Sequence, residues 1–331
     1  MSTRRALVTG ATGGLGLSLC ATLRDAGYWV RATGRSETNA ARLKETSHEV
    51  VRGDLLKMDV TALCDGVDVV FHAAALSSPW GPEAEFHTVN VVATQRLLAS
   101  AREAGADGFV FVSSPSIYAA LRDQPALTEE SPLPDRSLNA YARTKRIAEG
   151  LVLGANTPGF RTVSVRPRAL IGPDDKVLLP RILALASRGW FPALRGGRAL
   201  IELTDVRDAA AALVQADQNL AQASGKAINI SGGRPMSVTD LVGRLATALQ
   251  RPVAMRPVPV QLALFIARAS ELVCSALPAR PEPRLTTYGV ATLAYTQTFD
   301  LTRAHELLGY QPSYDAVSTA QMLARDAAAS A

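Results

Sequence analysis

Cysteine is scarce in this sequence, and its placement argues against two kinds of site. The 331 residues include three cysteines, Cys20, Cys64 and Cys274, and no two of them stand in a CxxC arrangement. An odd number of widely spaced cysteines provides neither a disulfide framework nor the ligand cluster of a zinc site. We therefore predict no bound metal, reduced thiols and a cytoplasmic location.

Aromatic residues are also few, at 5% of the chain, and the positive charge is dispersed. The net charge is +5, but the sequence has no run of five or more Lys and Arg residues. Proteins that bind nucleic acids usually combine a basic stripe with aromatic side chains on which bases stack. The sequence therefore predicts no nucleic-acid partner, and an anionic cofactor is a simpler reason for the positive charge.

Long uncharged apolar runs are missing as well, and we expect no signal peptide before the first strand. Residues 258–277 come nearest to a membrane span, which needs about 20 uncharged residues, but they contain Arg268 and Glu271. Large apolar residues recur in this segment at helical spacing. This face has three interpretations: it lines a substrate pocket, it packs on the main sheet, or it rests on a membrane surface. The residues are Leu262, Phe265, Ile266, Ala269, Leu272 and Val273.

The first half of the chain alternates short β-rich runs with helical patterns. This alternation predicts an α/β fold, a doubly wound parallel sheet covered by helices on both faces. After residue 170 the pattern loosens. We therefore predict two parts, residues 1–170 and a smaller cap of residues 171–331, which is interleaved with the main sheet around residues 200–230. Expected strands cover residues 6–9, 28–33, 50–51, 67–74, 109–113, 163–167 and 227–230, and expected helices cover residues 15–26, 89–104, 141–153, 178–186, 209–216 and 238–249.

A glycine-rich segment joins the first expected strand to the first expected helix. The segment GATGGLG places Gly10, Gly13 and Gly16 in GxxGxxG spacing. Glycines let backbone N–H groups approach a pyrophosphate, and the positive end of the helix favours its charge. A glycine turn without a ligand would look the same in isolation. The strand before the segment and the helix after it favour a dinucleotide site in a Rossmann-type sheet.

The end of the second expected strand bears on the choice of dinucleotide. Proteins that bind NAD usually place an acidic residue there for the ribose 2′-hydroxyl, whereas an arginine suits the 2′-phosphate of NADP. The sequence has Gly34, Arg35 and Ser36 at this position, and no acid comes before Glu37. We therefore favour NADP(H) as the cofactor, and NAD(H) stays open as an alternative.

Several separate motifs resemble one family. Over nearly the whole chain the sequence is similar to the extended short-chain dehydrogenase/reductases of the NAD-dependent epimerase/dehydratase superfamily, and within them to the 3β-hydroxysteroid dehydrogenase-like branch. It departs from the family pattern at Ala93 and Ala119, where glycine is usual. The matching segments are the glycine loop, Asp54-Leu55, residues 72–75 (HAAA), residues 90–94, residues 113–118, the YxxxK motif from Tyr141 to Lys145, Arg166-Pro167, residues 205–208 and FDLTRAHELLGYQP near the end.

The resemblance implies catalytic roles for three residues. Tyr141 exchanges a proton with the substrate oxygen, Ser114 donates a hydrogen bond to that oxygen, and Lys145 holds the cofactor ribose. The ordinary pKa of tyrosine, about 10, is too high for proton exchange at neutral pH, so a nearby ammonium is expected to lower it. Taken alone, a tyrosine and a lysine four residues apart also fit a surface pair on a helix.

The resemblance also implies a set of cofactor contacts, in which Asp54 meets the adenine. The expected cofactor-binding residues are Gly10, Thr12, Gly13, Gly14, Leu15, Gly16, Arg35, Ser36, Asp54, Leu55, Ala73, Ala74, Ala75, Asn90, Ser113, Tyr141, Lys145 and Pro167.

Other polar residues in these motifs have a simpler explanation. His72 stands alone, and we predict that it makes a structural hydrogen bond in a turn. Asp205 and Asp208 precede or begin an alanine-rich helix, so we predict helix capping and packing for them and not a catalytic pair of carboxylates.

Together these features predict an NADP(H)-dependent oxidoreductase that interconverts a carbonyl and a secondary alcohol on an apolar substrate, such as a β-keto or β-hydroxy acyl chain or a steroid-like ring system. A nucleotide-sugar epimerase or dehydratase is the first alternative, and a non-enzymatic NADP sensor is the second. Arg35 disfavours the enzymes that retain NAD, and the pair of Tyr141 and Lys145 disfavours a sensor. The expected partner is a small molecule. A homodimer and a membrane-surface contact stay open.

Overall fold

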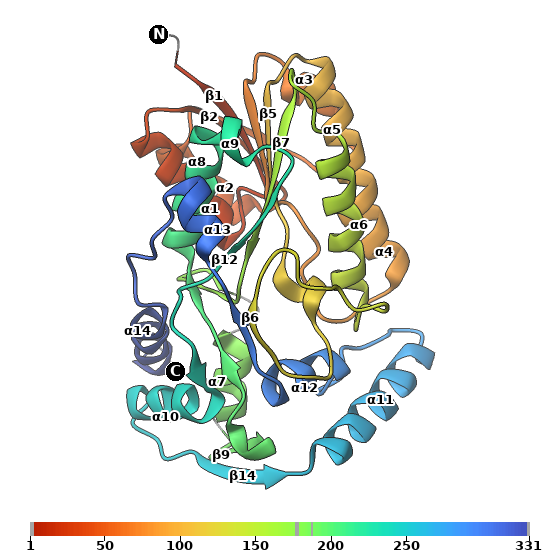
Figure 1. The fold of residues 1–331 in the computed structure, drawn as a ribbon, viewed down its shortest axis with the longest axis vertical. Helices are drawn as coiled ribbons and strands as arrows, with labels where there is room; N and C mark the ends of the chain where they lie inside the picture. Colours follow the sequence, from red (N-terminus) through yellow and green to blue (C-terminus); the bar gives the residue numbers. More distant parts are fainter. Residues whose placement is uncertain (1–2, 176–178, 187, 330–331) are drawn as a thin grey trace.

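A seven-stranded parallel sheet runs through the computed structural model, which describes residues 3–175, 179–186 and 188–329 (Figure 1). Its strand order is β12-β7-β5-β4-β1-β2-β3, and every neighbouring pair is parallel. The central strands are short runs of buried residues, as expected for a sheet that is covered on both faces. The bounds are β1 (Arg5–Thr9), β2 (Trp29–Gly34), β3 (Glu49–Arg52), β4 (Val69–His72), β5 (Gly108–Val112), β7 (Arg161–Pro167) and β12 (Ala227–Ile230).

Helices cover both faces of this sheet (Figure 1). One face carries α1 (Gly14–Asp25), α2 (Glu37–Thr46), α8 (Val206–Gln218) and α13 (Thr302–Leu308), and the other carries α3 (Val60–Cys64), α5 (Ala93–Glu103) and α6 (Ala140–Gly154). Each face has its own apolar core, with α1 and α8 in the first and α3, α5 and α6 in the second. The predicted doubly wound α/β fold is therefore confirmed.

The edge strand β12 comes from the part of the chain beyond residue 200. It pairs with β7, so that Ile228 lies opposite Val165. Helix α8, from the same part, packs against α1. The sheet and its helical cover thus include residues from both halves of the chain, while the division at residue 170 stays a prediction.

Most residues after 170 form a smaller layer beyond the carboxyl ends of the strands (Figure 1). Short strand pairs connect it, namely β8 with β11, β9 with β14, and β10 with β13. Its apolar core includes Phe191, Leu203 and Leu241. The expected helix 178–186 is observed as α7 (Leu179–Ala186), and residue 178 lies outside the described residues. The other bounds are β8 (Leu170–Ile171), β9 (Trp190–Leu194), β10 (Leu200–Ile201), β11 (Thr204–Asp205), β13 (Met236–Ser237), α10 (Val238–Ala248), β14 (Ala254–Val258), α11 (Val260–Ala276), α12 (Thr287–Ala294) and α14 (Ala316–Ala329).

Helix α11 turns its large apolar side chains to solvent. Phe265 is 71% exposed and Leu272 is 72% exposed, and Leu262, Ile266 and Val273 are exposed as well. The interpretation in which this face packs on the main sheet is therefore wrong. A contact with a membrane surface stays a prediction.

The buried face of α11 carries small residues. Ala263 and Ala267 are its buried residues, one turn apart, and they pack against Val290 and Ala294 of α12. Small side chains let the two helices approach closely, so the large residues of α11 end on the other side. This packing explains why the apolar periodicity pointed to the wrong face.

The described residues contain no candidate membrane span or metal cluster, and two of their thiols are buried. No helix in this part of the chain has both the length and the apolar character needed to cross a bilayer. No group of three or more His, Cys, Asp or Glu side chains in the same residues could hold a metal ion. Burial raises the pKa of the Cys20 and Cys64 thiols to about 12, so both stay protonated at neutral pH.

Candidate active site

A cavity of about 1190 Å³ lies at the carboxyl ends of the central strands. Its wall is formed on one side by the loops that follow β1 to β5 and β7, and on the other by residues of α7, β9, α10 and α12. Ligands of open α/β sheets bind at this edge. The cavity is therefore the candidate active site, and none of the α11 residues, all of which are described, lines it. The interpretation in which α11 forms the pocket wall is wrong.

The glycine loop after β1 forms one end of the cavity, and two of its positions require glycine. Gly10 has a φ of +68°, and a Cβ there would lie 2.6 Å from the backbone nitrogen of Ala74. A Cβ on Gly16 would lie 2.3 Å from the carbonyl oxygen of Gly10. The loop can pack this closely only because these residues have no side chains.

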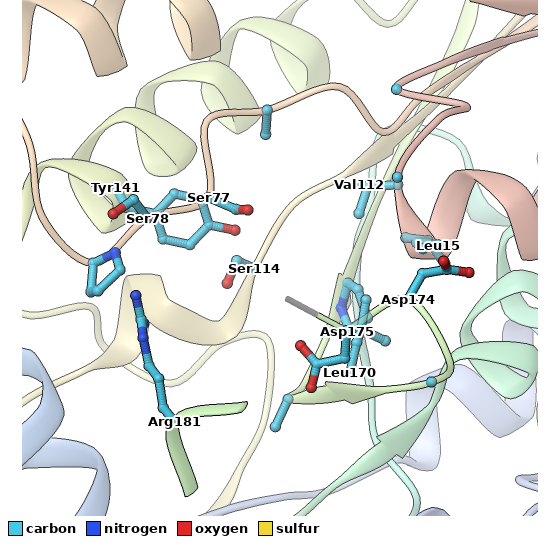
Figure 2. A pocket seen from close by; sticks show the side chains of 18 of the residues that line it. Leu15, Ser77, Ser78, Val112, Ser114, Tyr141, Leu170, Asp174, Asp175 and Arg181 are labelled. Carbon is cyan, nitrogen blue, oxygen red and sulfur yellow. The ribbon is translucent and has the colours of Figure 1, made fainter. Parts of the chain in front are cut away.

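The N-terminus of α1 is suited to an anion. The residue before the helix, Gly13, offers no side-chain cap, and the first turn contains no acid. Its N–H groups and the positive end of the helix dipole favour a phosphate. Asp174 approaches Gly14, but its carboxylate binds Arg42, with Oδ1 2.6 Å from Nη1 (Figure 2 shows Asp174 beside Leu15). The loop residues therefore fit the pyrophosphate of a dinucleotide.

Arg35 and Ser36 line the cavity where β2 ends. The Arg35 side chain is 66% exposed, and its Nη1 lies 3.8 Å from Oδ2 of Asp54, which follows β3. Because the two strands are parallel neighbours, both residues lie at the same edge of the sheet. A cation and a hydroxyl at this edge fit the 2′-phosphate of NADP.

The structure brings all but one of the expected cofactor-binding residues to the cavity wall. The exception is Asn90, which is buried and does not line the cavity. Its Oδ1 accepts a hydrogen bond from the Leu76 N–H at 2.7 Å, and its Nδ2 donates to Leu76 O and Thr144 Oγ1 at 3.1 Å each. Asn90 therefore positions the segment that follows β4, and its contact with the cofactor stays a prediction.

The two alanines at usual glycine positions fit without strain. Ala93 begins α5 after the π-helical turn η1 (Thr88–Val92) and has a φ of −64°. Ala119 has a φ of −54°. Because neither backbone is in the left-handed region, a side chain is tolerated at both positions.

Tyr141 and Ser114 reach the same region of the cavity from different elements. Asn139 caps α6 by accepting a hydrogen bond from the Ala142 N–H at 2.8 Å, which places Tyr141 in the first turn. Ser114 follows β5 and caps the short helix η2 (Pro115–Tyr118). The two side chains are hydrogen-bonded, and Figure 2 shows both at the cavity. This arrangement can hold and protonate a substrate oxygen.

Burial controls the pKa of Tyr141. It raises the pKa to about 12, although the hydrogen bond with Ser114 acts in the opposite direction. Lys145 lies one turn further along α6, but its Nζ donates to the Val112 carbonyl at 2.5 Å and lies 4.1 Å from the centre of the Phe111 ring. The expected lowering of the Tyr141 pKa by Lys145 is therefore wrong for this structure. The phenol is neutral and suited to donate a proton.

Replacing Lys145 by Met is expected to stabilise the fold in a pH-dependent way. Burial lowers the pKa of Lys145 from 10.5 to about 7. Below this value the folded protein carries a buried charge, and the substitution stabilises it by roughly 2–4 kcal/mol. Between these two pKa values, about 7 and 10.5, Lys145 is deprotonated in the folded protein but protonated in the unfolded chain. The wild type therefore gains stability as the pH rises, and the difference between the proteins shrinks.

Denaturant unfolding of both proteins at mildly acidic and mildly alkaline pH measures this difference. Lys57 is exposed, so Lys57→Met serves as a control without a pH-dependent effect. A Lys145→Met difference that stays constant across this range would show that the ammonium is not buried as a charge.

Several residues that line the cavity were not predicted as site residues. Ser77 and Ser78 lie on the loop after β4, and Figure 2 shows them among the lining side chains with Tyr141. Arg168 follows the Arg-Pro motif directly, which is the one local signal that pointed near it. Glu202 and Tyr288 also line the cavity, and neither stands in a motif.

His72, Asp205 and Asp208 have the structural roles that were predicted. His72 is buried, and its two ring nitrogens bind Thr9 Oγ1 at 2.7 Å and Thr94 Oγ1 at 2.8 Å. Burial lowers its pKa to about 3, so the ring is neutral. Asp205 caps α8. The Asp208 carboxylate accepts hydrogen bonds from two backbone N–H groups of the C-terminal segment.

Comparison with known proteins shows the family of this chain. The model of the NAD dependent epimerase/dehydratase family matches residues 6–231. The chain belongs to this family. It is thus an extended short-chain dehydrogenase/reductase, and the resemblance noted in the sequence is confirmed.

Two curated relatives match most of the chain. An uncharacterized protein of Escherichia coli (strain K12), YbjS, is 35% identical over 316 residues, which cover 93% of each chain. The 2-alkyl-3-oxoalkanoate reductase of Stenotrophomonas maltophilia (strain K279a) is 33% identical over 312 residues, which cover 92% of this chain and 94% of the relative.

Solved structures share the architecture. The structure of MoeE5 in complex with UDP-glucose and NAD is 26% identical to this chain and superposes with a TM-score of 0.75. The match covers 98% of this chain and 99% of MoeE5. Both the sheet and the C-terminal layer therefore have counterparts in that protein.

Proposed function

We propose that the protein is an NADP(H)-dependent oxidoreductase that interconverts a carbonyl and a secondary alcohol on an apolar substrate. The proposal is carried by the hydrogen-bonded pair of Ser114 and Tyr141, which shares one cavity with the glycine loop. A nicotinamide dinucleotide, when bound, donates or accepts the hydride. The protein supplies the proton and the orientation of the reacting groups.

The neutral form of Tyr141 is the form that carbonyl reduction requires. With a pKa of about 12, the phenol keeps its proton at neutral pH. In the reduction, the Tyr141 hydroxyl donates this proton to the carbonyl oxygen, and Ser114 donates a hydrogen bond to the same oxygen. Alcohol oxidation needs the phenolate as a base, which burial disfavours.

Arg35 and Ser36 support NADP(H) as the cofactor. Arg35 provides a charge opposite to that of the 2′-phosphate, and its partial exposure leaves it free to reach a ligand in the cavity. Asp54 partly balances this charge. No acidic residue lies at the end of β2 to bind a free ribose 2′-hydroxyl.

The substrate end of the cavity supports an apolar substrate. Aliphatic and aromatic side chains from several elements form its wall. The inference of an apolar substrate therefore rests on these residues and no longer on α11. One curated relative is named 2-alkyl-3-oxoalkanoate reductase, and its name describes a carbonyl compound with alkyl chains. The wall residues are Leu170, Ile182, Phe191, Ile201, Leu203, Val238, Leu241, Val242, Leu285 and Leu293.

Catalytic efficiency is expected to rise with the length of the substrate chain. Each additional buried CH₂ contributes up to about 0.8 kcal/mol, which is roughly a fourfold increase in kcat/KM. A series of 3-oxo methyl esters of increasing chain length, assayed with NADPH by absorbance at the nicotinamide band, measures this slope. A flat series would contradict an apolar pocket.

A nucleotide-sugar epimerase or dehydratase is the second candidate, because MoeE5 binds UDP-glucose and NAD in a similar fold. Arg181, Arg188 and Arg284 line the cavity and offer positive charge for a diphosphate. The same assay separates the candidates. Turnover of UDP-sugars without net consumption of NADPH would favour the epimerase, and tight NADPH binding with no turnover of any substrate would favour a sensor.

A further inference from the structure

Large apolar side chains gather on one outer face of the molecule, along helix α11. Ten large apolar residues are exposed in the described part of the chain, and six of them lie on α11 or directly after it. The other four are scattered over α6, β10, α14 and the segment before α14. Single exposed apolar residues are common on soluble proteins, whereas a contiguous patch marks a surface that contacts a partner. The six residues, which we call the α11 patch, are Leu262, Phe265, Ile266, Leu272, Val273 and Leu277.

The spacing of these residues makes the patch one continuous stripe. From Leu262 to Leu277, apolar residues recur every three or four positions, with the exposed Ala269 and Ala276 between the larger side chains. Residues at this spacing lie on one side of a helix. The helix turns its other side to α12, and Figure 1 shows α11 at the outer edge of the C-terminal layer. The stripe therefore runs the length of α11 and faces away from the protein.

The charge around the α11 patch is positive. Arg268 lies one helical turn from both Phe265 and Leu272, at the edge of the stripe. Arg256 of β14 and Arg280, which follows the helix, are exposed as well. Among the residues that the structure describes, none of these three arginines forms a salt bridge. Their charges are therefore available to a partner.

The acidic residues of this region are already paired. Glu271 is the one acid of α11, and its carboxylate accepts hydrogen bonds from the N–H and the hydroxyl of Thr287 at 2.6 and 2.8 Å. Glu282 forms a salt bridge with Arg181, with Oε1 2.7 Å from Nη2. The α11 patch thus combines exposed apolar side chains with positive charge that no acid of the helix balances.

This combination fits the surface of an anionic lipid bilayer. An amphipathic helix with arginines beside an apolar stripe lies in the plane of the bilayer, with its apolar side chains among the acyl chains and its cations at the headgroups. A second copy of the chain fits less well. A twofold interface would place the arginines of one patch against those of the other, and Glu271 is engaged by α12.

Helix α12 is the layer between the α11 patch and the cavity. Its Val290 and Ala294 pack against α11, whereas Tyr288 and Thr292 line the cavity. The segment that follows α11 also reaches the cavity wall, through Arg284. A bilayer on the patch therefore lies one helix away from the candidate active site.

We propose that α11 docks the protein onto the surface of an anionic lipid bilayer. The apolar stripe enters the boundary between headgroups and acyl chains, and Arg256, Arg268 and Arg280 contact the lipid phosphates. The helix lies along the surface and does not cross the bilayer, since Arg268 and Glu271 interrupt its apolar character. This docking goes beyond the proposed oxidoreductase function and does not depend on it, because it needs neither cofactor nor substrate.

Cosedimentation with vesicles tests the docking. The wild type is expected to bind vesicles that contain phosphatidylglycerol at least about 10-fold more tightly than vesicles of phosphatidylcholine alone, and added salt should weaken this binding. The double variant Phe265→Ser, Leu272→Ser removes two large apolar side chains and is expected to bind at least about 30-fold more weakly. Arg268→Gln removes one cation and should weaken binding about fivefold.

Two exposed apolar residues outside the α11 patch provide the matched control. Ile147 lies on α6 and Met322 on α14. The double variant Ile147→Ser, Met322→Ser should therefore bind the anionic vesicles as tightly as the wild type. All four substituted side chains are exposed, so both double variants should unfold at the temperature of the wild type.

A tryptophan in place of Phe265 measures insertion directly. The fluorescence of Phe265→Trp is expected to be quenched by bromine atoms on the acyl chains of the vesicle lipids, beyond the quenching of the wild type. Ile147→Trp carries the same reporter at an exposed position outside the patch and should show no additional quenching. Because both variants keep a large apolar side chain, this measurement holds even if the serine variants fold poorly.

The docking would be overturned by a wild type that does not bind anionic vesicles, by serine variants of the patch that bind as tightly as the wild type, or by an unquenched Phe265→Trp. Sedimentation velocity without lipid tests the other occupant. A dimer that Phe265→Ser, Leu272→Ser converts to a monomer would assign the patch to a second copy of the chain. Because these measurements use neither NADPH nor substrate, their failure and the failure of the proposed oxidoreductase function are distinguishable.

Discussion

Tyr141→Phe is expected to lower kcat/KM for carbonyl reduction by about 100-fold to 10,000-fold, the contribution of general acid catalysis, while NADPH affinity stays near that of the wild type. The substitution keeps the half-buried ring in the first turn of α6 and removes only the hydroxyl. In the proposed reaction, that hydroxyl carries the proton for the substrate oxygen, and Ser114 is its hydrogen-bond partner. The loss should appear in kcat, because proton donation matters in the transition state more than in the bound ground state.

A second buried tyrosine provides the control for this variant. The Tyr28 hydroxyl donates to Asp217 at 2.8 Å, and Tyr28 does not line the cavity. Tyr28→Phe therefore removes a comparable buried hydroxyl outside the active site, and it should affect stability but not kcat. If Tyr141→Phe retained full activity, the assignment of the proton donor would be wrong.

The sequence predicts best those features that depend on neighbouring residues. The glycine loop is local, since the steric need for Gly10 and Gly16 arises where a strand, a turn and a helix follow one another. The same is true of Tyr141 and Lys145, which a capped helix places one turn apart. Ser114 and Tyr141 are far apart in the sequence, and the fold of the sheet brings them together. Only the family resemblance predicted this pairing.

The residues that the sequence did not reveal are brought together only by the fold. Arg168 follows β7, Glu202 lies in the segment before β11 and Tyr288 lies in α12, and each has its own local surroundings. No periodicity marks them, because their shared property is the cavity that they line. Their significance comes from the cavity that they share, which the sequence does not show.

Two predictions failed because one physical effect outweighed another. Two of the three interpretations of α11 placed its apolar residues inside the protein, but Ala263 and Ala267 allow the closer packing against α12 and leave Phe265 and Leu272 outside. The pKa of Tyr141 was expected to fall near Lys145, but loss of water around the buried phenol is the larger effect. In both cases the sequence identified the groups correctly, and the balance between them depended on the packing.

The choice of cofactor gives the second large expected effect. Arg35→Asp is expected to lower the ratio of kcat/KM with NADPH to that with NADH by about 100-fold or more, because it replaces a charge-assisted hydrogen bond to the 2′-phosphate with repulsion. The new acid would also stand at the end of β2, where it can accept a hydrogen bond from the ribose 2′-hydroxyl of NADH. Steady-state kinetics with both cofactors and one ketone measures this ratio.

Arg52 provides the matched control for this variant. It ends the neighbouring strand β3, its Nη1 pairs with Glu37 Oε1 at 2.8 Å, and it does not line the cavity. Arg52→Asp changes the net charge by the same amount and should leave the ratio unchanged. Because Arg35 is 66% exposed, added salt should also weaken the wild-type preference for NADPH. A wild type that uses both cofactors equally well would show that Arg35 does not bind the 2′-phosphate.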